Sequence, residues 1–226
     1  MTEGPRRGRP PVLLDGRTVP ERLVEAARDL FAEKGYESTS VQDVVERAGV
    51  TKGAMYHYYR SKEELLAETY ARVLDRQLAR LEAIVAGDDP VPQRLARAAA
   101  DVVVSTVEEL PGSTILLGSL HQLGERHRRE VYAQRRRYRA LLLGLVEEGA
   151  EAGVLRDDVD LDVAVDYFLG AVHHLVVWWR PERGPSPDEV GATFARLLLD
   201  SLRPGPAPLV TSDVLDRSNQ SGDRHW

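Results

Sequence analysis

The feature that most constrains this fold is the junction between two short amphipathic segments on either side of Gly49. The first segment runs from Ser40 to about Ala48, with apolar residues at helical spacing. Gly49 tolerates the left-handed backbone that a tight turn between helices requires. Thr51 then caps a second helix that ends near Tyr59. This pattern predicts two short helices that cross closely, as in a helix-turn-helix.

Signals for helix starts and stops recur along the rest of the chain. Capping boxes are expected at Thr18–Glu21, Ser61–Glu64 and Ser186–Glu189, and the first and last have proline in the first turn. No convincing alternation of β-branched residues indicates a strand, so the fold class is predicted to be all-α. The expected helices cover about residues 18–35, 40–48, 51–59, 61–86, 91–110, 114–123, 125–152, 161–179 and 187–202.

Composition excludes several chemistries. The 226-residue chain has no cysteine, which rules out disulfides, thiolate metal sites and cysteine nucleophiles. No apolar run approaches the roughly 18 residues of a membrane span, and the N-terminus lacks the apolar core of a signal peptide. We therefore expect a cytoplasmic protein that does not enter the membrane.

The charge is distributed unevenly. The net charge of −6 is not typical of a nucleic-acid binder, but residues 1–62 carry 11 Lys or Arg against 9 Asp or Glu. The remainder carries 19 basic and 27 acidic residues. Because DNA binding depends on local basic surface, this asymmetry permits a DNA-binding N-terminal region.

The outward face of the second short helix is polar and aromatic and carries no acid. Small Gly53 allows close approach to a groove, and Thr51, Lys52 and Tyr56 are suited to base edges or phosphates. Lys62 is expected to act as a phosphate clamp. Alternatively, the segment is a plain helical hairpin with tyrosines in its core.

The segment from Phe31 to Leu66 closely resembles the N-terminal domain of the TetR/AcrR family of regulators. The matching pieces are the Gly35-Tyr36 helix exit, residues 39–41, residues 48–53, and Tyr56 followed by residues 61–66. The resemblance implies a three-helix DNA-binding head, a larger helical ligand-binding and dimerisation domain, and a homodimer that reads a palindromic operator. It assigns DNA-binding roles to Thr39, Ser40, Thr51, Lys52, Gly53, Tyr56, His57 and Lys62.

One departure from the family concerns the end of the recognition helix. The family often has a His-Phe pair there, whereas this chain has Tyr58-Tyr59 with His57 one place earlier. This departure puts a core role for Tyr59 and a phosphate role for His57 or Tyr58 in doubt.

The domain boundaries follow from these elements. We expect a flexible basic arm at residues 1–17, a DNA-binding domain at 18–62, a ligand-binding and dimerisation domain at 63–203, and a disordered tail at 204–226. Arg6, Arg7 and Arg9 in the arm are suited to a narrow minor groove. The same arm is equally well read as a solvated leader.

Two features of the body suggest an effector. Residues 125–139 form an unusually basic helix, and residues 178–190 resemble the acyl-CoA-responsive branch of the family. A CoA thioester would require cationic contacts of this kind. The alternative is a solvated basic face paired with acids. The candidate ligand-binding residues are His121, Gln122, Arg136, Tyr138, Phe168 and Trp178.

The last two helices have broad apolar faces, and the family's usual dimer pairs them across a two-fold axis. The candidate interface residues are Val172, Leu175, Phe194 and Leu198. Neither a metal site nor a catalytic site is expected, because no zinc-ligand spacing, nucleophile elbow or phosphate loop is found.

The sequence therefore predicts a ligand-responsive repressor, with lipid, fatty-acid or sterol catabolism genes as targets and a CoA thioester as effector. Two alternatives stay open: a regulator of an efflux pump that responds to hydrophobic drugs, and a helical ligand-binding protein without a DNA function. The pattern does not distinguish a repressor from an activator.

Overall fold

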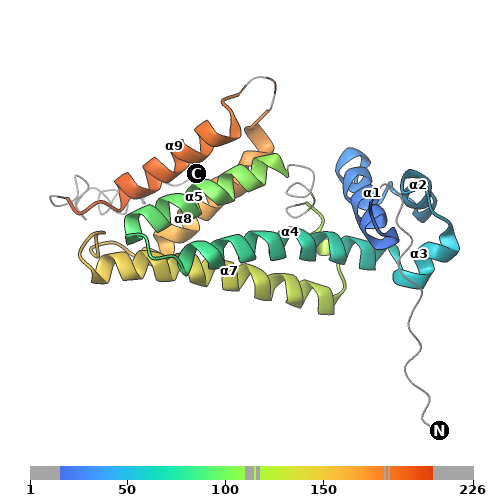
Figure 1. Ribbon diagram of the computed structural model, residues 1–226, viewed down its shortest axis with the longest axis horizontal. Coiled ribbons are helices and arrows are strands. Elements are labelled where there is room, and N and C mark those ends of the chain that lie inside the picture. The colour runs from blue at the N-terminus through green and yellow to red at the C-terminus, as the bar shows by residue number, and fades with distance from the viewer. Residues whose placement is uncertain (1–15, 110–114, 116–117, 181, 183, 206–226) are drawn as a thin grey trace, which may run out of the picture.

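The computed structural model describes residues 16–109, 115, 118–180, 182 and 184–205. Within these ranges the chain forms α-helices, one short 3-10 helix and no β-strand (Figure 1). A small cluster of helices lies at one end of an elongated helical body. The all-α prediction is confirmed.

The head consists of α1 (Val19–Lys34), α2 (Val41–Arg47) and α3 (Lys52–Tyr58). The predicted caps set their starts: Thr18 and Ser40 form complete capping boxes, and the Thr51 hydroxyl accepts from the Ala54 amide at 3.1 Å. Gly49 has a φ of 62°, the left-handed conformation that the turn between α2 and α3 requires.

One apolar core holds the head together and extends into the body. Leu23, Phe31, Val44 and Met55 are buried in it, together with side chains from the start of the following helix. Ile115, Leu123 and Val131 from later in the chain join the same cluster. The head therefore shares its core with the body, and burial of this apolar surface stabilises their relative placement.

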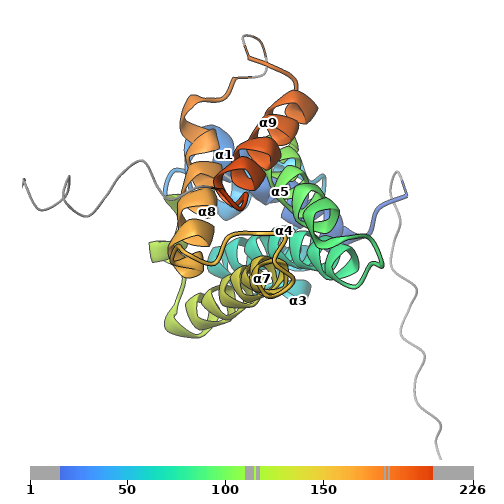
Figure 2. The same cartoon turned by 90° about the vertical axis from the view of Figure 1, so that its left-hand side faces the viewer.

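The body begins with α4 (Lys62–Val85), which runs from the head into the larger domain (Figure 1). It continues with α5 (Val91–Glu108), the 3-10 helix η1 (Leu120–Gln122), α7 (Glu125–Glu151), α8 (Leu161–Trp178) and α9 (Pro187–Ser201). Helix α7 lies beside α4, and α5 packs most extensively on α9. Seen along the molecule's length, these helices surround a common interior (Figure 2).

The α5–α9 contact depends on Gly191. A Cβ atom at this position would lie 2.9 Å from Val104 Cγ2 and 3.1 Å from the Ala100 carbonyl oxygen. Only glycine lets the two helices approach this closely without a shift of the neighbouring atoms.

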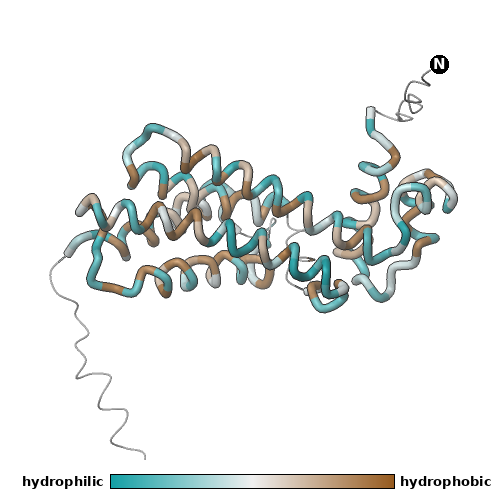
Figure 3. The backbone as a smooth tube through the Cα atoms, turned by 90° about the horizontal axis from the view of Figure 1, so that it is seen from below, coloured by the Kyte–Doolittle hydropathy of each residue, from teal (hydrophilic) through white to brown (hydrophobic). Residues whose placement is uncertain are grey.

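Helix α8 is more apolar than we expected from the sequence. Leu161–Trp178 is long and apolar enough to cross a membrane by length and composition, with a mean hydropathy of 1.3. The expectation that no segment would approach this limit was therefore wrong. Its Val165, Phe168, Val172 and Leu175 are buried in the body core, so one face of the helix is used inside the protomer. Figure 3 shows how apolar and polar stretches alternate along the helices.

Some predictions lie outside the described residues. They are Arg6, Arg7 and Arg9 of the expected arm, the tail after Gly205, and part of the helix expected at 114–123.

Candidate DNA-binding face and effector cavity

Helix α3 presents a continuous exposed face without an acidic residue. Lys52, Gly53, Tyr56 and His57 are all exposed, and Tyr56 keeps 53 % of its surface accessible. Met55, on the opposite side, is fully buried and fixes the helix against the head core. This arrangement leaves one cation, two ring side chains and a glycine available to a DNA groove.

The start of α2 adds Ser40, which is exposed and whose hydroxyl accepts from the Asp43 amide at 3.1 Å. Its neighbour Thr39 does not fit the predicted DNA role. Thr39 is only 1 % exposed, and its hydroxyl donates to the carbonyls of Gly35 and Leu30. The side chain closes the loop between α1 and α2 instead.

Lys62 also differs from the expected phosphate clamp. Its Nζ donates to the carbonyl oxygens of Tyr36 and Thr39, each at 2.8 Å. The same atom lies 4.1 Å from the centre of the Tyr36 ring. These contacts fasten the start of α4 to the loop between α1 and α2, so we now interpret Lys62 as a structural residue of the head.

The tyrosines after the recognition face divide between surface and core. Tyr58 is 43 % exposed, and its ring makes an edge contact with His57 at a centroid distance of 4.8 Å. Tyr59 packs against the head core, and burial raises its pKa to about 12. A core role therefore suits Tyr59, although the departure from the family pattern had put that role in doubt.

The body contains a cavity of about 360 Å³ between α4, α5, α7 and α8. Its apolar lining includes Leu74 from α4, Val102 from α5 and Leu169 from α8. Tyr138 from α7 completes it, and burial raises the pKa of that phenol. The volume lies at the lower end of the range typical of small-molecule sites.

Polar side chains from α4, α7 and α8 also line this cavity. Arg135 is partly buried, and burial lowers its pKa. Arg139 is paired with Asp166 at 2.6 Å and Asp162 at 2.9 Å, so its charge is compensated. Gln77 of α4 and His173 of α8 complete the polar lining. An amphipathic ligand would match this combination.

Most of the predicted ligand-binding residues lie elsewhere. Tyr138 lines the cavity, but His121 and Gln122 lie in η1 and do not. Phe168 is buried in the core against Phe194, and Trp178 is 47 % exposed at the end of α8. Arg136 is exposed and does not line the cavity. Helical register explains the errors on α7 and α8, because neighbouring residues on a helix face different directions.

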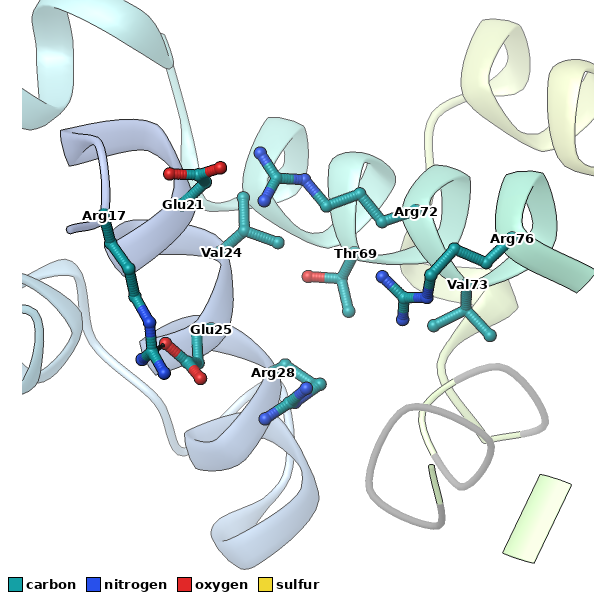
Figure 4. A pocket seen from close by; sticks show the side chains of 9 residues that line it. All are labelled: Arg17, Glu21, Val24, Glu25, Arg28, Thr69, Arg72, Val73 and Arg76. Atoms are coloured by element: carbon teal, nitrogen blue, oxygen red, sulfur yellow. Dashed lines mark hydrogen bonds and ion pairs between the residues drawn. The ribbon is translucent and has the colours of Figure 1, made fainter. Parts of the chain in front are cut away.

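A second hollow, of about 260 Å³, lies between α1 and α4 where the head meets the body (Figure 4). Four arginines surround it, from both sides of this junction: Arg17, Arg28, Arg72 and Arg76. Each is paired with a carboxylate, respectively Glu25, Asp29, Glu68 and Glu109. The hollow therefore offers little uncompensated positive charge to an anion.

The predicted dimer residues are mostly internal to the protomer. Val172, Leu175 and Leu198 are at most 5 % exposed, and Phe194 is partly buried against Phe168. They hold the protomer together, so the prediction that they form the dimer interface was wrong. A second apolar stripe points outward and consists of Val163, Tyr167, Val177 and Trp178 on α8 with Leu197 on α9.

The sequence does carry a signal for this outward stripe. On α8, buried residues recur at 165, 168, 172 and 175, while exposed Val163, Tyr167 and Val177 follow the same helical spacing on another face. Two apolar stripes on one helix indicate two packing partners. Among the described residues, no group of three or more His, Cys, Asp or Glu side chains could hold a metal ion.

Comparisons with known proteins match both parts of the chain. Residues 23–69 match the family model of bacterial regulatory proteins of the tetR family, and residues 88–202 match a tetracyclin repressor-like C-terminal domain. The HTH-type transcriptional repressor KstR2 of Rhodococcus jostii is 29% identical over 187 residues, which cover 80% of this chain and 89% of the relative.

Two further similarities are informative. The fatty acid metabolism regulator protein of Bacillus subtilis is 24% identical, over 70% of this chain and 81% of the relative. The crystal structure of the TetR family regulator PfmR from Thermus thermophilus superposes with a TM-score of 0.74 at 32% identity. That alignment covers 79% of this chain and 97% of the other.

Proposed function

Since this chain belongs to the TetR family of bacterial regulatory proteins, we propose that it binds a palindromic operator as a homodimer and represses transcription until a small molecule occupies its body. The family consists of transcriptional regulators and not of enzymes. The observation that carries the proposal is the placement of α4, which lines the body cavity with Leu74 and also contributes Leu65 to the head core.

The DNA-binding part of the proposal rests on the exposed face of α3. Lys52 supplies a phosphate or base contact, and Tyr56 and His57 supply hydrogen-bonding rings. Thr51 and Ser40 present exposed hydroxyls at the starts of α3 and α2. Arg6, Arg7 and Arg9 of the N-terminal arm are proposed to reach the minor groove beside this face.

The homodimer is proposed to form through the outward stripe of α8 and α9. Within this stripe, Tyr167 is 80 % exposed and Val163 is 62 % exposed. Exposed apolar patches on a protein surface commonly mark protein–protein interfaces. Pairing α8 and α9 with the same helices of a second copy would form a four-helix interface and cover this stripe. A cytoplasmic location is part of the same proposal.

The effector is proposed to be a CoA thioester with an apolar acyl group. The apolar walls of the cavity suit the acyl part, and its volume of about 360 Å³ leaves the nucleotide outside. Arg135 beside the cavity and exposed Arg136 on the same helix would then meet its phosphates. The fatty acid metabolism regulator and KstR2, which is described as a ketosteroid transcriptional regulator, support control of lipid or sterol catabolism genes.

A mobility-shift titration tests the effector. Operator complex is titrated with palmitoyl-CoA, a steroid-derived CoA thioester, free CoA and palmitate. The proposal expects release by at least one thioester at micromolar concentration and no release by free CoA or palmitate. Release by an uncharged hydrophobic drug, with no response to any thioester, would instead establish the efflux-type regulator, which the apolar lining also favours.

A further inference from the structure

Adjacent residues at the start of α4 face opposite parts of the molecule. Lys62 reaches the loop between α1 and α2, as described above. Glu63 reaches the other way, to the beginning of α7, which lies 61 residues or more further along the chain. The first turn of α4 is therefore joined to both the head and the body.

The Glu63 contact is directional and involves two donors. Its Oε1 accepts from the Gly124 amide at 3.0 Å and lies 2.7 Å from Nδ1 of His127. Gly124 is the N-cap of α7, and a glycine has no side chain that could cap the helix. Glu63 thus supplies from α4 a carboxylate acceptor for the N-cap amide of α7, which has no side-chain cap of its own.

The surroundings hold the histidine in one orientation. Arg126 Nη2 lies 2.8 Å from Nε2 of His127, so the ring bridges a guanidinium and a carboxylate. His127 is well covered, with 15 % of its side chain exposed, against 31 % for Glu63. Burial alone would raise the pKa of Glu63, but the bonds from His127 and the Gly124 amide outweigh it and leave the pKa below its usual value.

The contact between Glu63 and His127 lies nearer to the head than the cavity does. The cavity lies further along both helices, at Leu74 of α4 and Arg135 of α7. At 1.5 Å per residue, these are about 16 Å from Glu63 and about 12 Å from His127. The two helices run in the same direction from the head, with Gln134 donating to Asp75 at 2.5 Å between them.

We propose that Glu63 is a positioning residue that clasps α7 to the base of the DNA-binding head through His127 and the Gly124 amide. If α4 and α7 separate at the cavity, the two helices would then pivot about this clasp, and the head would turn. Apolar contacts of Leu123 and Val131 lie beside the clasp and lack its directionality. The role in regulation rests on the proposed function, whereas the clasp itself is a property of the protein without DNA or effector.

Spin-label distance measurements test the clasp. The chain has no cysteine, so the Glu46→Cys and Ala133→Cys changes place one label on α2 and one on α7 without background. Both positions are exposed. Labelled protein is mixed with excess unlabelled protein, so that distances within one protomer are recorded in the absence of DNA.

We expect a single narrow distance peak for the parent protein and loss of that peak in Glu63→Ala and His127→Phe. His127→Asn keeps a donor near the position of Nδ1 and should restore the narrow peak, which a purely steric role of the ring would not predict. Gln134→Ala, which removes a different α4–α7 hydrogen bond, is the matched control and should keep it.

Narrow, unshifted peaks in both Glu63→Ala and His127→Phe would overturn the proposal. Circular dichroism confirms that each variant is folded, and His127→Phe decides the question if Glu63→Ala does not fold. Because no operator is present, the clasp can fail while the chain still represses, or hold while the chain binds no DNA.

Discussion

The Nζ of Lys62 lies over the ring of Tyr36 and donates to the Tyr36 carbonyl at 2.8 Å. A single side chain therefore fixes the first residue of α4 to the exit of α1. This relationship places the base of the long helix in a defined position under the head, which a regulator requires if movement in the body is to reach the DNA.

Replacing this lysine should weaken the head more than it alters the electrostatics of DNA binding. We expect Lys62→Met to lower the free energy of unfolding by about 1–2 kcal/mol, through lost hydrogen bonds from a charged group. Urea denaturation measures this loss. A fully stable variant whose operator affinity has a reduced salt dependence would restore the phosphate-clamp interpretation.

The exposed lysine of α3 should behave in the opposite way. We expect Lys52→Ala to leave stability unchanged, to weaken operator binding and to reduce the slope of log affinity against log salt by about 1. Fluorescence anisotropy at several salt concentrations measures the slope. Arg97→Ala, in the body on α5, is the control and should leave the slope unchanged. Equal slopes for all three proteins would remove Lys52 from the DNA contacts.

These two lysines show how far sequence patterns reach. Caps at Thr18, Ser40 and Thr51 depend on residues three places apart, so the sequence predicted the starts of α1, α2 and α3. The environment of Lys62 depends on Tyr36 and Thr39, which are more than 20 residues away. Composition of the local segment cannot distinguish an ammonium bonded to backbone carbonyls from one that is exposed to solvent.

The same limit explains the body. An apolar stripe on α8 was evident, but the sequence did not tell which stripe packs inside the protomer, and the internal residue Val172 was preferred over the outward Tyr167. The basic character of α7 was evident as well, yet Arg137 and Arg139 pair with acids of α4 and α8. Three further arginines of α7 pair with acids of the same helix: Arg126, Arg128 and Arg129. Tertiary neighbours decide these roles.

The outward stripe should control assembly. We expect Tyr167→Asp to convert the dimer to monomer, because a carboxylate would be buried unpaired at the two-fold interface. Sedimentation equilibrium reports the mass. Tyr132→Asp, which changes a 44 % exposed tyrosine on α7, should stay dimeric. If Tyr167→Asp has the mass of the parent dimer, the interface lies elsewhere.

The close approach of α5 and α9 should not tolerate an added methyl group. We expect Gly191→Ala to destabilise the protein by about 1–3 kcal/mol, because the neighbouring backbone must shift. Gly144→Ala, where nothing lies within 4 Å of the new Cβ, should instead be neutral or slightly stabilising. Thermal and urea unfolding compare the two. A loss in Gly144→Ala equal to that in Gly191→Ala would show that packing is not the cause.

Selection of bound sequences from random double-stranded DNA tests the central claim most directly, with the parent protein beside the Tyr56→Ala and Tyr132→Ala variants. The account predicts that the parent and Tyr132→Ala enrich the same inverted repeat, and that Tyr56→Ala retains its fold but does not enrich it. No enriched sequence for the folded parent, or an undiminished repeat for Tyr56→Ala, would contradict recognition of an operator through α3.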